Sequence, residues 1–248
     1  MTELVHSSTA AGVTTLTLDS QPNRNALSAE LMEQLSAGLA DALADESVRV
    51  VVLSHAGRVF CSGMDLRARD VPVTAFPALL TAIATAPKPV VARVGGPARA
   101  GGIGLLAAAD IAIAGSSATF AFTEVRIGVV PAVISIPVLP RMLPRAAHEL
   151  FLTGEVFDAQ RAAAAGLVNV AVPDEELDAE VARYAGMLAQ GAPGALAATK
   201  ELLAAPSSDY AAMAALSASR FASAEGQEGM AAFREKRPAS WVPTPPTG

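Results

Sequence analysis

Hydrophobic and polar residues alternate along this chain with two different periods, one typical of strands and one typical of helices. Residues 13–19 (VTTLTLD) alternate between apolar and polar positions and are rich in β-branched side chains, which predicts a half-exposed strand. Residues 27–45 carry an apolar side chain at every fourth position, which predicts an amphipathic helix with Ser28 as its N-cap. The almost continuous apolar run over 48–56 (VRVVVLSHA) predicts a buried strand.

The remainder of the chain continues this alternation and becomes purely helical toward its end. We expect, in order, a helix around 73–85, a strand over 90–96, a helix after the glycines near 101, short strands over 110–115 and 119–124, a strand over 166–173 and a helix over 174–190. Because strands and helices alternate, the sheet is predicted to be largely parallel and covered by helices. The start of the chain, around His6, is predicted to be irregular. We divide the chain into a core over 1–190 and a helical lid or oligomerisation region over 191–248.

Composition and charge exclude several classes of protein. The 248 residues suffice for one large α/β domain, and although 52% of them are hydrophobic, no apolar run reaches the roughly 18 residues of a membrane span. The N-terminus lacks the apolar stretch of a signal peptide, and the single cysteine, Cys61, permits neither an internal disulfide nor a cysteine-based zinc site, so we expect a cytoplasmic protein. A net charge of −6 without a basic stripe argues against a nucleic-acid partner. Because histidine and acidic residues do not cluster, no metal site is expected.

The glycine-rich stretch over 98–109 (ARAGGIGLLAAA) exposes an unusual amount of bare backbone. Residues 102–107 match the G-x-G-x-x-A fingerprint of nicotinamide-binding enzymes, and Glu124 follows Gly104 by 20 residues. That fingerprint should come directly after its strand, whereas here residues 97–100 separate it from the preceding predicted strand. We therefore disfavour a dinucleotide site.

A second interpretation of these glycines needs only backbone chemistry. The first N–H groups of a helix have no partner within it and suit an oxygen that gains negative charge. The loop VFCSGMDL (59–66) also follows a predicted buried strand and offers the N–H of Met64, so two loops could direct two donors at one oxygen. The alternative is tight helix packing without any ligand. Cys61 is expected to be a buried small residue, because no histidine or lysine lies near it in the sequence.

Six stretches, spread over nearly the whole chain, resemble the motifs of one enzyme family. They are PNRNALS (22–28), FCSGMDL (60–66), GGPARAGGIGLLAAADIAIA (95–114), ATFAFTEVRIGVVPAVIS (118–135), LFLTGEVFDAQRAAAAGLVNVAVP (150–173) and EGMAAFREKRPASW (228–241). In this order they resemble the crotonase, or enoyl-CoA hydratase/isomerase, superfamily. The resemblance implies an α/β fold, a crotonase-type spiral of ββα units with a C-terminal helical domain. It also implies an acyl-CoA thioester substrate, no cofactor beyond the coenzyme A of that substrate, and a homotrimer or dimer of trimers.

The same resemblance implies roles for individual residues. The thioester oxygen would lie between the backbone N–H groups of Met64 and Gly101, and Glu124 aligns with a glutamate that protonates C2 of the substrate. A thioester enolate is a strong base in water, so its stabilisation is the main catalytic task. The residues that match the family's coenzyme A contacts are Ala26, Ser62, Leu66, Phe233 and Lys236, the last two often supplied in relatives by a neighbouring subunit.

One departure from the family leaves the reaction open. Hydratases of the best-known type carry another glutamate that orients the attacking water, and that position is Gly104 here. The first interpretation is a hydratase in which Glu124 and backbone groups orient the water, and EVRIGVVPAVIS looks most like a hydratase branch for branched enoyl-CoAs. The alternative is an isomerase in which Glu124 alone shuttles a proton, and a more distant one is a non-catalytic acyl-CoA-binding protein.

The surroundings of the remaining polar residues give weaker expectations. Burial at the end of an apolar strand should raise the pKa of Glu124. Without the family resemblance, the sequence would favour a surface glutamate beside Arg126 at this position. Two aspartates are expected to cap helices or turns, and three arginines could contact phosphate or a substrate carboxylate or simply be solvated. These residues are Asp65, Asp110, Arg67, Arg69 and Arg99.

Overall fold

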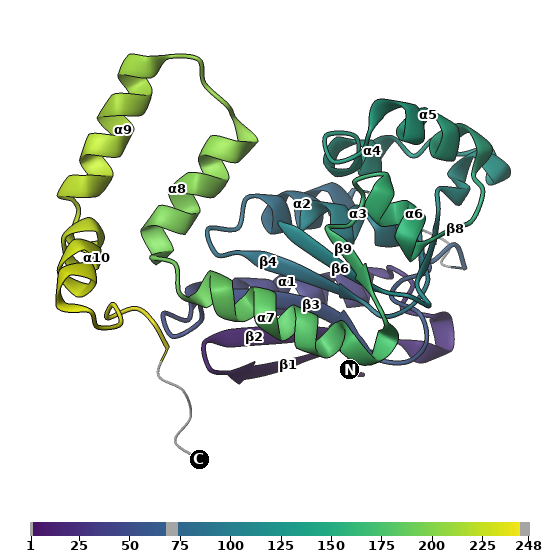
Figure 1. The fold of residues 1–248 in the computed structure, drawn as a ribbon. Coiled ribbons are helices and arrows are strands. Elements are labelled where there is room, and N and C mark those ends of the chain that lie inside the picture. The colour runs from purple at the N-terminus through teal and green to yellow at the C-terminus, as the bar shows by residue number, and fades with distance from the viewer. Residues whose placement is uncertain (1, 68–73, 244–248) are drawn as a thin grey trace.

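The computed structural model describes residues 2–67 and 74–243, and its centre is a six-stranded sheet in the order β1-β2-β3-β4-β6-β9 (Figure 1). The strands are β1 (Val5–Ala10), β2 (Val13–Leu18), β3 (Val50–His55), β4 (Val90–Val94), β6 (Ile111–Gly115) and β9 (Val170–Val172). β1 pairs with β2 in antiparallel register, and the other neighbouring strands pair in parallel. The prediction of a largely parallel sheet is confirmed.

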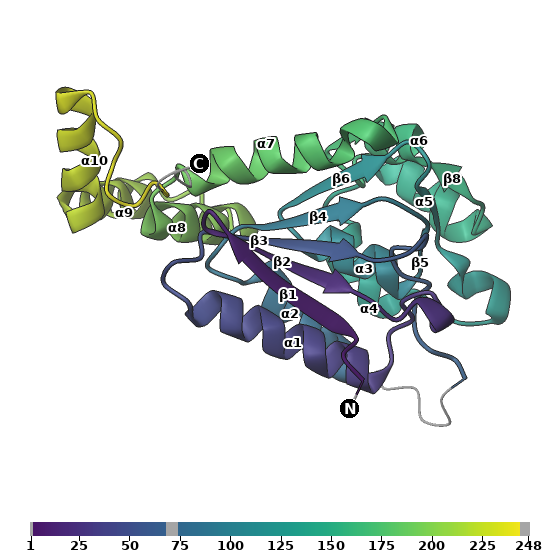
Figure 2. The ribbon, with the colours of Figure 1, turned by 90° about the horizontal axis from the view of Figure 1, so that it is seen from below.

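Helices cover both faces of this sheet (Figures 1 and 2). One layer holds α1 (Ala29–Ala44), α2 (Ala75–Ala84) and α3 (Gly101–Ala108), and α7 (Leu177–Ala189) covers the other face. Strand β3 serves both layers, because Val51 and Leu53 belong to the core beneath the first layer while Val50 and Val52 pack with residues of α7. A strand buried on both sides has no polar face, which explains the continuous apolar run in its sequence.

The amphipathic helix predicted near the N-terminus forms as α1 with the predicted cap. The Ser28 hydroxyl accepts a hydrogen bond from the backbone N–H of Leu31 at 3.2 Å. The buried face of α1 contains Leu31, Leu35 and Leu39, which lie on the predicted apolar stripe. Local sequence signals are therefore sufficient to define this element.

The expectation of an irregular N-terminus is wrong, because β1 forms the edge of the sheet. Val5 is the only buried residue of β1, so the strand leaves little apolar signal in the sequence. The strand is held by its ladder with β2 and by a two-residue turn at Ala11 and Gly12, whose φ angles of 49° and 76° are those of a tight hairpin. His6 points to Asp19, with 3.0 Å between Nε2 and Oδ2.

A second, smaller sheet stands at the carboxyl ends of the parallel strands. It contains β5 (Ala98–Arg99), β7 (Thr119–Ala121) and β8 (Phe157–Asp158) in the order β5-β7-β8. The strand predicted over 119–124 ends at Ala121 and continues as the short 3-10 helix η2 (Thr123–Ile127). Helices α4 (Ala132–Val138), α5 (Pro144–Thr153) and α6 (Ala159–Ala164) follow (Figure 1). Helix α4 packs on α3, α5 lies against η2, and α6 packs on β7 and β8.

The C-terminal part is helical as predicted and extends away from the sheet (Figure 1). It consists of α8 (Pro193–Ala204), α9 (Tyr210–Ala222) and α10 (Ala224–Glu235), and within 193–235 Ala232 is the one buried residue. Whether 1–190 and 191–248 behave as separate units stays a prediction. Over residues 2–67 and 74–243, the helices are too short or too polar for any of them to cross a membrane.

Candidate active site

Two loops that leave the neighbouring strands β3 and β4 run side by side. The backbone N–H of Phe60 donates to the carbonyl of Pro97 at 3.1 Å, and the N–H of Arg99 donates to the carbonyl of Cys61 at 3.0 Å. A Cβ built on Gly102 would lie 2.6 Å from the Cys61 carbonyl oxygen. The chain therefore needs glycine here for the loops to approach each other, before any ligand is considered.

This approach brings together the two predicted oxyanion-hole residues. Gly63 has a φ of +93°, and a Cβ at this position would lie only 3.6 Å from the backbone nitrogen of Gly101. Two hydrogen bonds bracket Met64, because the N–H of Leu27 donates to Gly63 and the N–H of Asp65 donates to Leu27. These two hydrogen bonds hold the loop against Leu27, and neither of them uses the N–H of Met64.

Neither predicted donor is used elsewhere in the described part of the chain. The N–H groups of Met64 and Gly101 make no hydrogen bond to residues 2–67 or 74–243. Gly101 is the first residue of α3, so the positive end of the helix dipole lies behind its N–H. The preceding residue, Ala100, has a φ of +47°, which is a strained backbone for alanine and fixes the entry into the helix. The arrangement suits an oxygen that acquires negative charge.

Glu124 reaches the same region on the 3-10 helix η2. Strand β7 pairs in parallel with β5, and the N–H of Ala100 donates to the carbonyl of Ala121 at 3.3 Å, so η2 begins beside the glycine loop. Within the described residues, the Glu124 Oε2 atom is buried and has no hydrogen-bond partner. Loss of solvation raises the pKa of this carboxyl above its ordinary value, as predicted. An unpaired buried carboxyl with a raised pKa can both accept and return a proton.

The space beside Gly104, which would hold a further glutamate, is filled with hydrocarbon. A Cβ built on Gly104 would lie 2.7 Å from Cγ2 of Ile134 and 3.2 Å from Cζ of Phe76, and both side chains are only 3% exposed. Gly104 therefore allows α4 to pack closely on α3. A carboxylate at this position has no room in the present packing.

A pocket of about 350 Å³ opens beside the Met64 loop. Its walls come from the 3-10 helix η1 (Gln21–Asn23), the residues that follow it and the loop around Met64. The Ser62 hydroxyl donates to the carbonyl of Asn23 at 3.2 Å, which ties the two walls together. Among the lining residues are Ala26, Ser62, Leu66, Met64, Arg24 and Arg67. The structure thus places three predicted coenzyme A contacts and one predicted oxyanion donor around one opening.

Residues 8–243 match the sequence model described as enoyl-CoA hydratase/isomerase. The chain belongs to this family. Its α/β core followed by C-terminal helices is the crotonase-type fold that the motifs predicted.

Individual relatives resemble the chain over nearly their whole length. An enoyl-CoA hydratase from Mycobacterium avium is 45% identical, with a TM-score of 0.76 and coverage of 97% of this chain and 100% of that one. A protein from Thermus thermophilus with a provisional enoyl-CoA hydratase name is 38% identical and covers 89% of this chain and 94% of its own. The carnitinyl-CoA dehydratase of Proteus mirabilis is 33% identical, with coverage of 97% and 99%. These names describe more than one reaction, so the family alone leaves the reaction open.

Two of the coenzyme A contacts implied by the family lie far from the pocket. Phe233 and Lys236 belong to α10 and its C-terminal cap, at the end of the molecule opposite to the smaller sheet (Figures 1 and 2). Neither residue lines the pocket beside Met64, and Phe233 is 86% exposed. Within one copy of the chain, these two residues cannot join the other predicted contacts.

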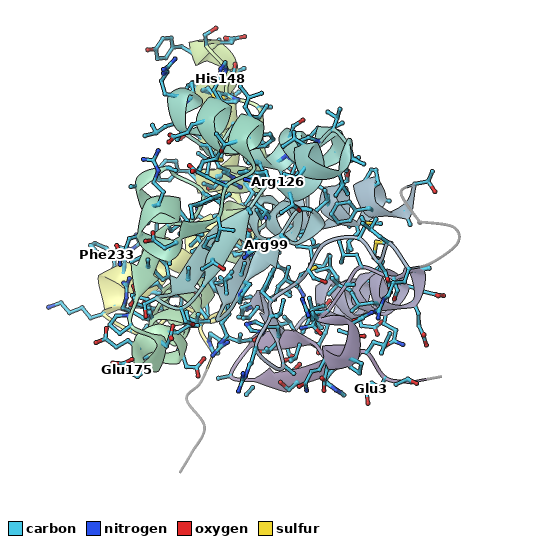
Figure 3. All side chains as sticks on the ribbon, turned by 90° about the vertical axis from the view of Figure 1, so that its right-hand side faces the viewer. Glu3, Arg99, Arg126, His148, Glu175 and Phe233 are labelled. Atoms are coloured by element: carbon cyan, nitrogen blue, oxygen red, sulfur yellow. The ribbon has the colours of Figure 1, made fainter. Side chains whose placement is uncertain are left out.

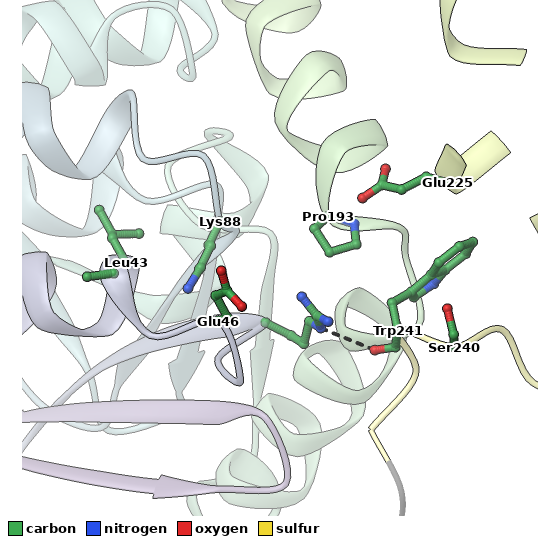
Figure 4. Close-up of a pocket in the computed structure, with 9 residues that line it drawn as sticks. Leu43, Glu46, Lys88, Pro193, Glu225, Ser240 and Trp241 are labelled. Carbon is green, nitrogen blue, oxygen red and sulfur yellow. Dashed lines mark hydrogen bonds between the residues drawn. The ribbon is translucent and has the colours of Figure 1, made fainter. Parts of the chain in front are cut away.

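Another pocket, of about 500 Å³, is lined by none of the residues that the family motifs assign to the site. It lies between the start of the parallel strands and the C-terminal helices, and Arg49 binds the carbonyl of Trp241 across it (Figure 4). Lys88 donates to the carbonyls of Ala42 and Asp45, and Glu225 accepts from the backbone of α8. Arg49 therefore links the core to the segment after α10, whereas the bonds of Lys88 lie within the core and those of Glu225 lie within the C-terminal helices.

The other singled-out residues have structural partners. Arg99 donates to Thr119 and to the carbonyl of Ala98, which joins β5 to β7. Burial raises the pKa of the Cys61 thiol to about 12, so it is not a nucleophile. Asp65 accepts hydrogen bonds from Arg67.

Of the two remaining singled-out residues, one has structural partners. Asp110 accepts from Lys200 and from the backbone of Val90, so it links α8 to the start of β4 and does not cap a helix as predicted. Arg69 lies outside the described residues.

Proposed function

We propose that this chain is an enoyl-CoA hydratase that acts on a 2-enoyl-CoA thioester. The proposal rests on the pairing of β5 with β7, which sets the turn that bears Glu124 beside the glycine loop. Among the described residues, the buried Oε2 of Glu124 and the backbone N–H groups of Met64 and Gly101 have no hydrogen-bond partner. A base beside an oxyanion hole is what enolate chemistry at C2 of a thioester requires.

In the proposed reaction the thioester oxygen accepts hydrogen bonds from Met64 and Gly101. The Glu124 carboxylate accepts a proton from water as the water oxygen bonds to C3, and the electron pair of the double bond moves toward the thioester oxygen. The enolate then takes the proton from Glu124 at C2, which regenerates the carboxylate. Burial raises the pKa of Glu124, which makes its carboxylate a stronger base toward water than an ordinary glutamate.

The packing at Gly104 favours a second candidate, an enoyl-CoA isomerase. Ile134 and Phe76 fill the side of α3 where a water-orienting carboxylate would stand. A single carboxylate is sufficient for isomerisation, in which Glu124 removes a proton from C2 of a 3-enoyl-CoA and returns it to C4. The double bond then moves into conjugation with the thioester, and no water is consumed.

We further propose that the pocket beside Met64 receives the nucleotide end of coenzyme A. Ala26, Ser62 and Leu66 supply a small-residue and apolar wall, and Arg24 stands at the opening with no side-chain hydrogen bond to any described residue. Arg67 is already partly neutralised by Asp65, so Arg24 is the better partner for a phosphate.

Assembly as a homotrimer or a dimer of trimers is part of the proposal. The C-terminal helices expose large apolar side chains, among them Leu203, Tyr210, Phe221 and Phe233. Such surfaces are typical of protein interfaces. In an assembly, Phe233 and Lys236 of a second copy would complete the coenzyme A site.

The proposal is tested with two substrates and one variant. Wild-type protein should reduce the conjugated-thioester absorbance of a 2-enoyl-CoA and yield a 3-hydroxyacyl-CoA, whereas an isomerase would instead raise that absorbance from a 3-enoyl-CoA. Glu124→Gln should lower turnover by about 10²–10⁴-fold with little change in acyl-CoA affinity. Glu175→Gln, a change at an exposed glutamate just before α7, is the matched control and should leave activity unchanged. If the wild-type protein binds acyl-CoA but turns over neither substrate, it is a non-catalytic acyl-CoA-binding protein.

A further inference from the structure

We propose that Arg126 is a positioning residue that locks the turn carrying Glu124 to the end of helix α5. The inference rests on the proposed role of Glu124 in proton transfer. Arg126 follows Glu124 by two residues in η2, and Figure 3 shows it among the teal helices above Arg99. Among the described residues its guanidinium forms no ion pair with Glu124, although the two residues are close in the sequence.

Arg126 instead binds the C-terminal end of α5. Its Nε donates to the carbonyl of Gly154 at 2.9 Å, and its Nη2 donates to the carbonyl of Thr153 at 3.1 Å. The last carbonyls of a helix lack partners within the helix and carry the negative end of its dipole. A planar guanidinium can satisfy two such carbonyls at once, which a single ammonium cannot do in the same geometry.

The contact between η2 and α5 is close on the other side as well. Gly154 adopts a left-handed conformation, and a Cβ built on it would lie 3.0 Å from the carbonyl oxygen of Phe122 and 3.1 Å from Nε of Arg126. The Phe122 ring packs on Phe151 of α5, with 4.0 Å between ring centroids. The segment that bears Glu124 is therefore attached to α5 both before and after the glutamate.

This attachment has an electrostatic consequence for Glu124. Because Arg126 is committed to the α5 carbonyls, no described cation pairs with the Glu124 carboxyl, and Oε2 stays buried and free. A guanidinium turned toward the carboxyl would lower its pKa, and a loosened turn would expose it to water with the same direction of effect. Arg126 thus sets both the position and the basicity of the proton-transfer group.

The test is the pH dependence of turnover in Arg126→Met and Arg126→Lys. Arg126→Met keeps the length of the side chain but loses its donors, and we expect kcat to fall by up to about 10²-fold, the cost of a misplacement near 1 Å, with KM nearly unchanged. The acid limb of the kcat profile should move to lower pH as Glu124 becomes more solvated, and Arg126→Lys should restore part of both effects. Arg161→Met is the control, since Arg161 binds Glu149 of α5 at the surface and makes no hydrogen bond or ion pair to η2 among the described residues.

Several results would overturn the inference. One is a folded Arg126→Met variant with wild-type kcat and acid limb, and another is a loss of kcat with an unmoved acid limb, which indicates a merely structural role. If Arg126→Met does not fold, Arg126→Lys decides, because wild-type kcat and pH profile in that variant contradict the need for two donors. If Glu124→Gln has wild-type activity, the proposed function itself is wrong. If Glu124→Gln is inactive but Arg126→Met has the kcat and pH profile of the wild type, only the inference about Arg126 is wrong.

Discussion

Gly104→Glu, which places a carboxylate where the best-known hydratases carry one, is predicted to disrupt the packing of α4 on α3. The new Cβ would lie 2.7 Å from Cγ2 of Ile134 and 3.4 Å from its Cβ. Carbon atoms in contact are ordinarily about 3.5–4.0 Å apart, so the Ile134 methyl group must move by roughly 1 Å. Ile134 is β-branched and buried, and it cannot turn away without shifting the helix.

The magnitude follows from the type of clash. Overpacking in a well-filled core costs about 1–3 kcal/mol, so Gly104→Glu should lower the free energy of unfolding by at least this amount. Ile134→Ala alone should cost about 2–5 kcal/mol because it leaves a cavity. In the double variant the new side chain enters that cavity. The double variant should therefore lose less free energy of unfolding than the two single variants lose together, by about 0.5–3 kcal/mol.

The assay combines urea unfolding with the absorbance of a conjugated thioester. Unfolding of the wild type, the two single variants and the double variant gives the coupling energy, and Gly104→Ala separates the clash from the effect of the new charge. Relative to Ile134→Ala, the double variant should gain hydration of short, straight 2-enoyl-CoAs, because it has room for a second carboxylate near Glu124. Like charges at close range raise one of the two pKa values, which leaves an acid and a base together.

Two outcomes would refute this reasoning. If the losses of unfolding free energy in the two single variants sum to that of the double variant within about 0.5 kcal/mol, Gly104 and Ile134 are not coupled. A Gly104→Glu variant as stable as the wild type would show that α4 yields freely and that the apolar packing does not exclude a second carboxylate.

Two further predictions concern stability and assembly. The pKa of Glu124 is raised in the folded state, so the folded protein binds more protons than the unfolded chain between the ordinary and the raised value, and stability should fall as pH rises through that window. Glu124→Gln cannot ionise at this position and does not lose stability in this window. In thermal unfolding it should be more stable than the wild type at pH 8 but not at pH 4. An equal difference in stability at both pH values would show that the buried Glu124 carboxyl is not the cause. Light scattering should give a trimer or hexamer, and Phe233→Ala or Lys236→Ala should weaken acyl-CoA binding although both residues lie far from the pocket of their own chain. A fully active monomer at micromolar concentration would rule out a shared site.

The sequence by itself determined the elements whose signals are local. The four-residue repeat and the Ser28 hydroxyl define α1, and the continuous apolar run of β3 predicts a strand covered on both faces. The motifs around Met64, Gly101 and Glu124 predicted the family and the single carboxylate. These features depend on side chains a few residues apart, whose spacing is fixed by the geometry of a helix or a strand.

Features that depend on contacts between distant segments became visible in the folded chain alone. Strand β1 is formed by backbone pairing, which leaves almost no apolar pattern in the sequence. The attachment of Arg126 to Gly154 and the contact of Gly104 with Ile134 join segments roughly 30 residues apart, where neither partner reveals the other. The position of Phe233 far from the pocket is likewise set by how α8, α9 and α10 leave the core. The hydrophobic periodicity of a sequence indicates which face of a helix or strand is buried, whereas the residues that cover that face depend on the packing of the whole chain.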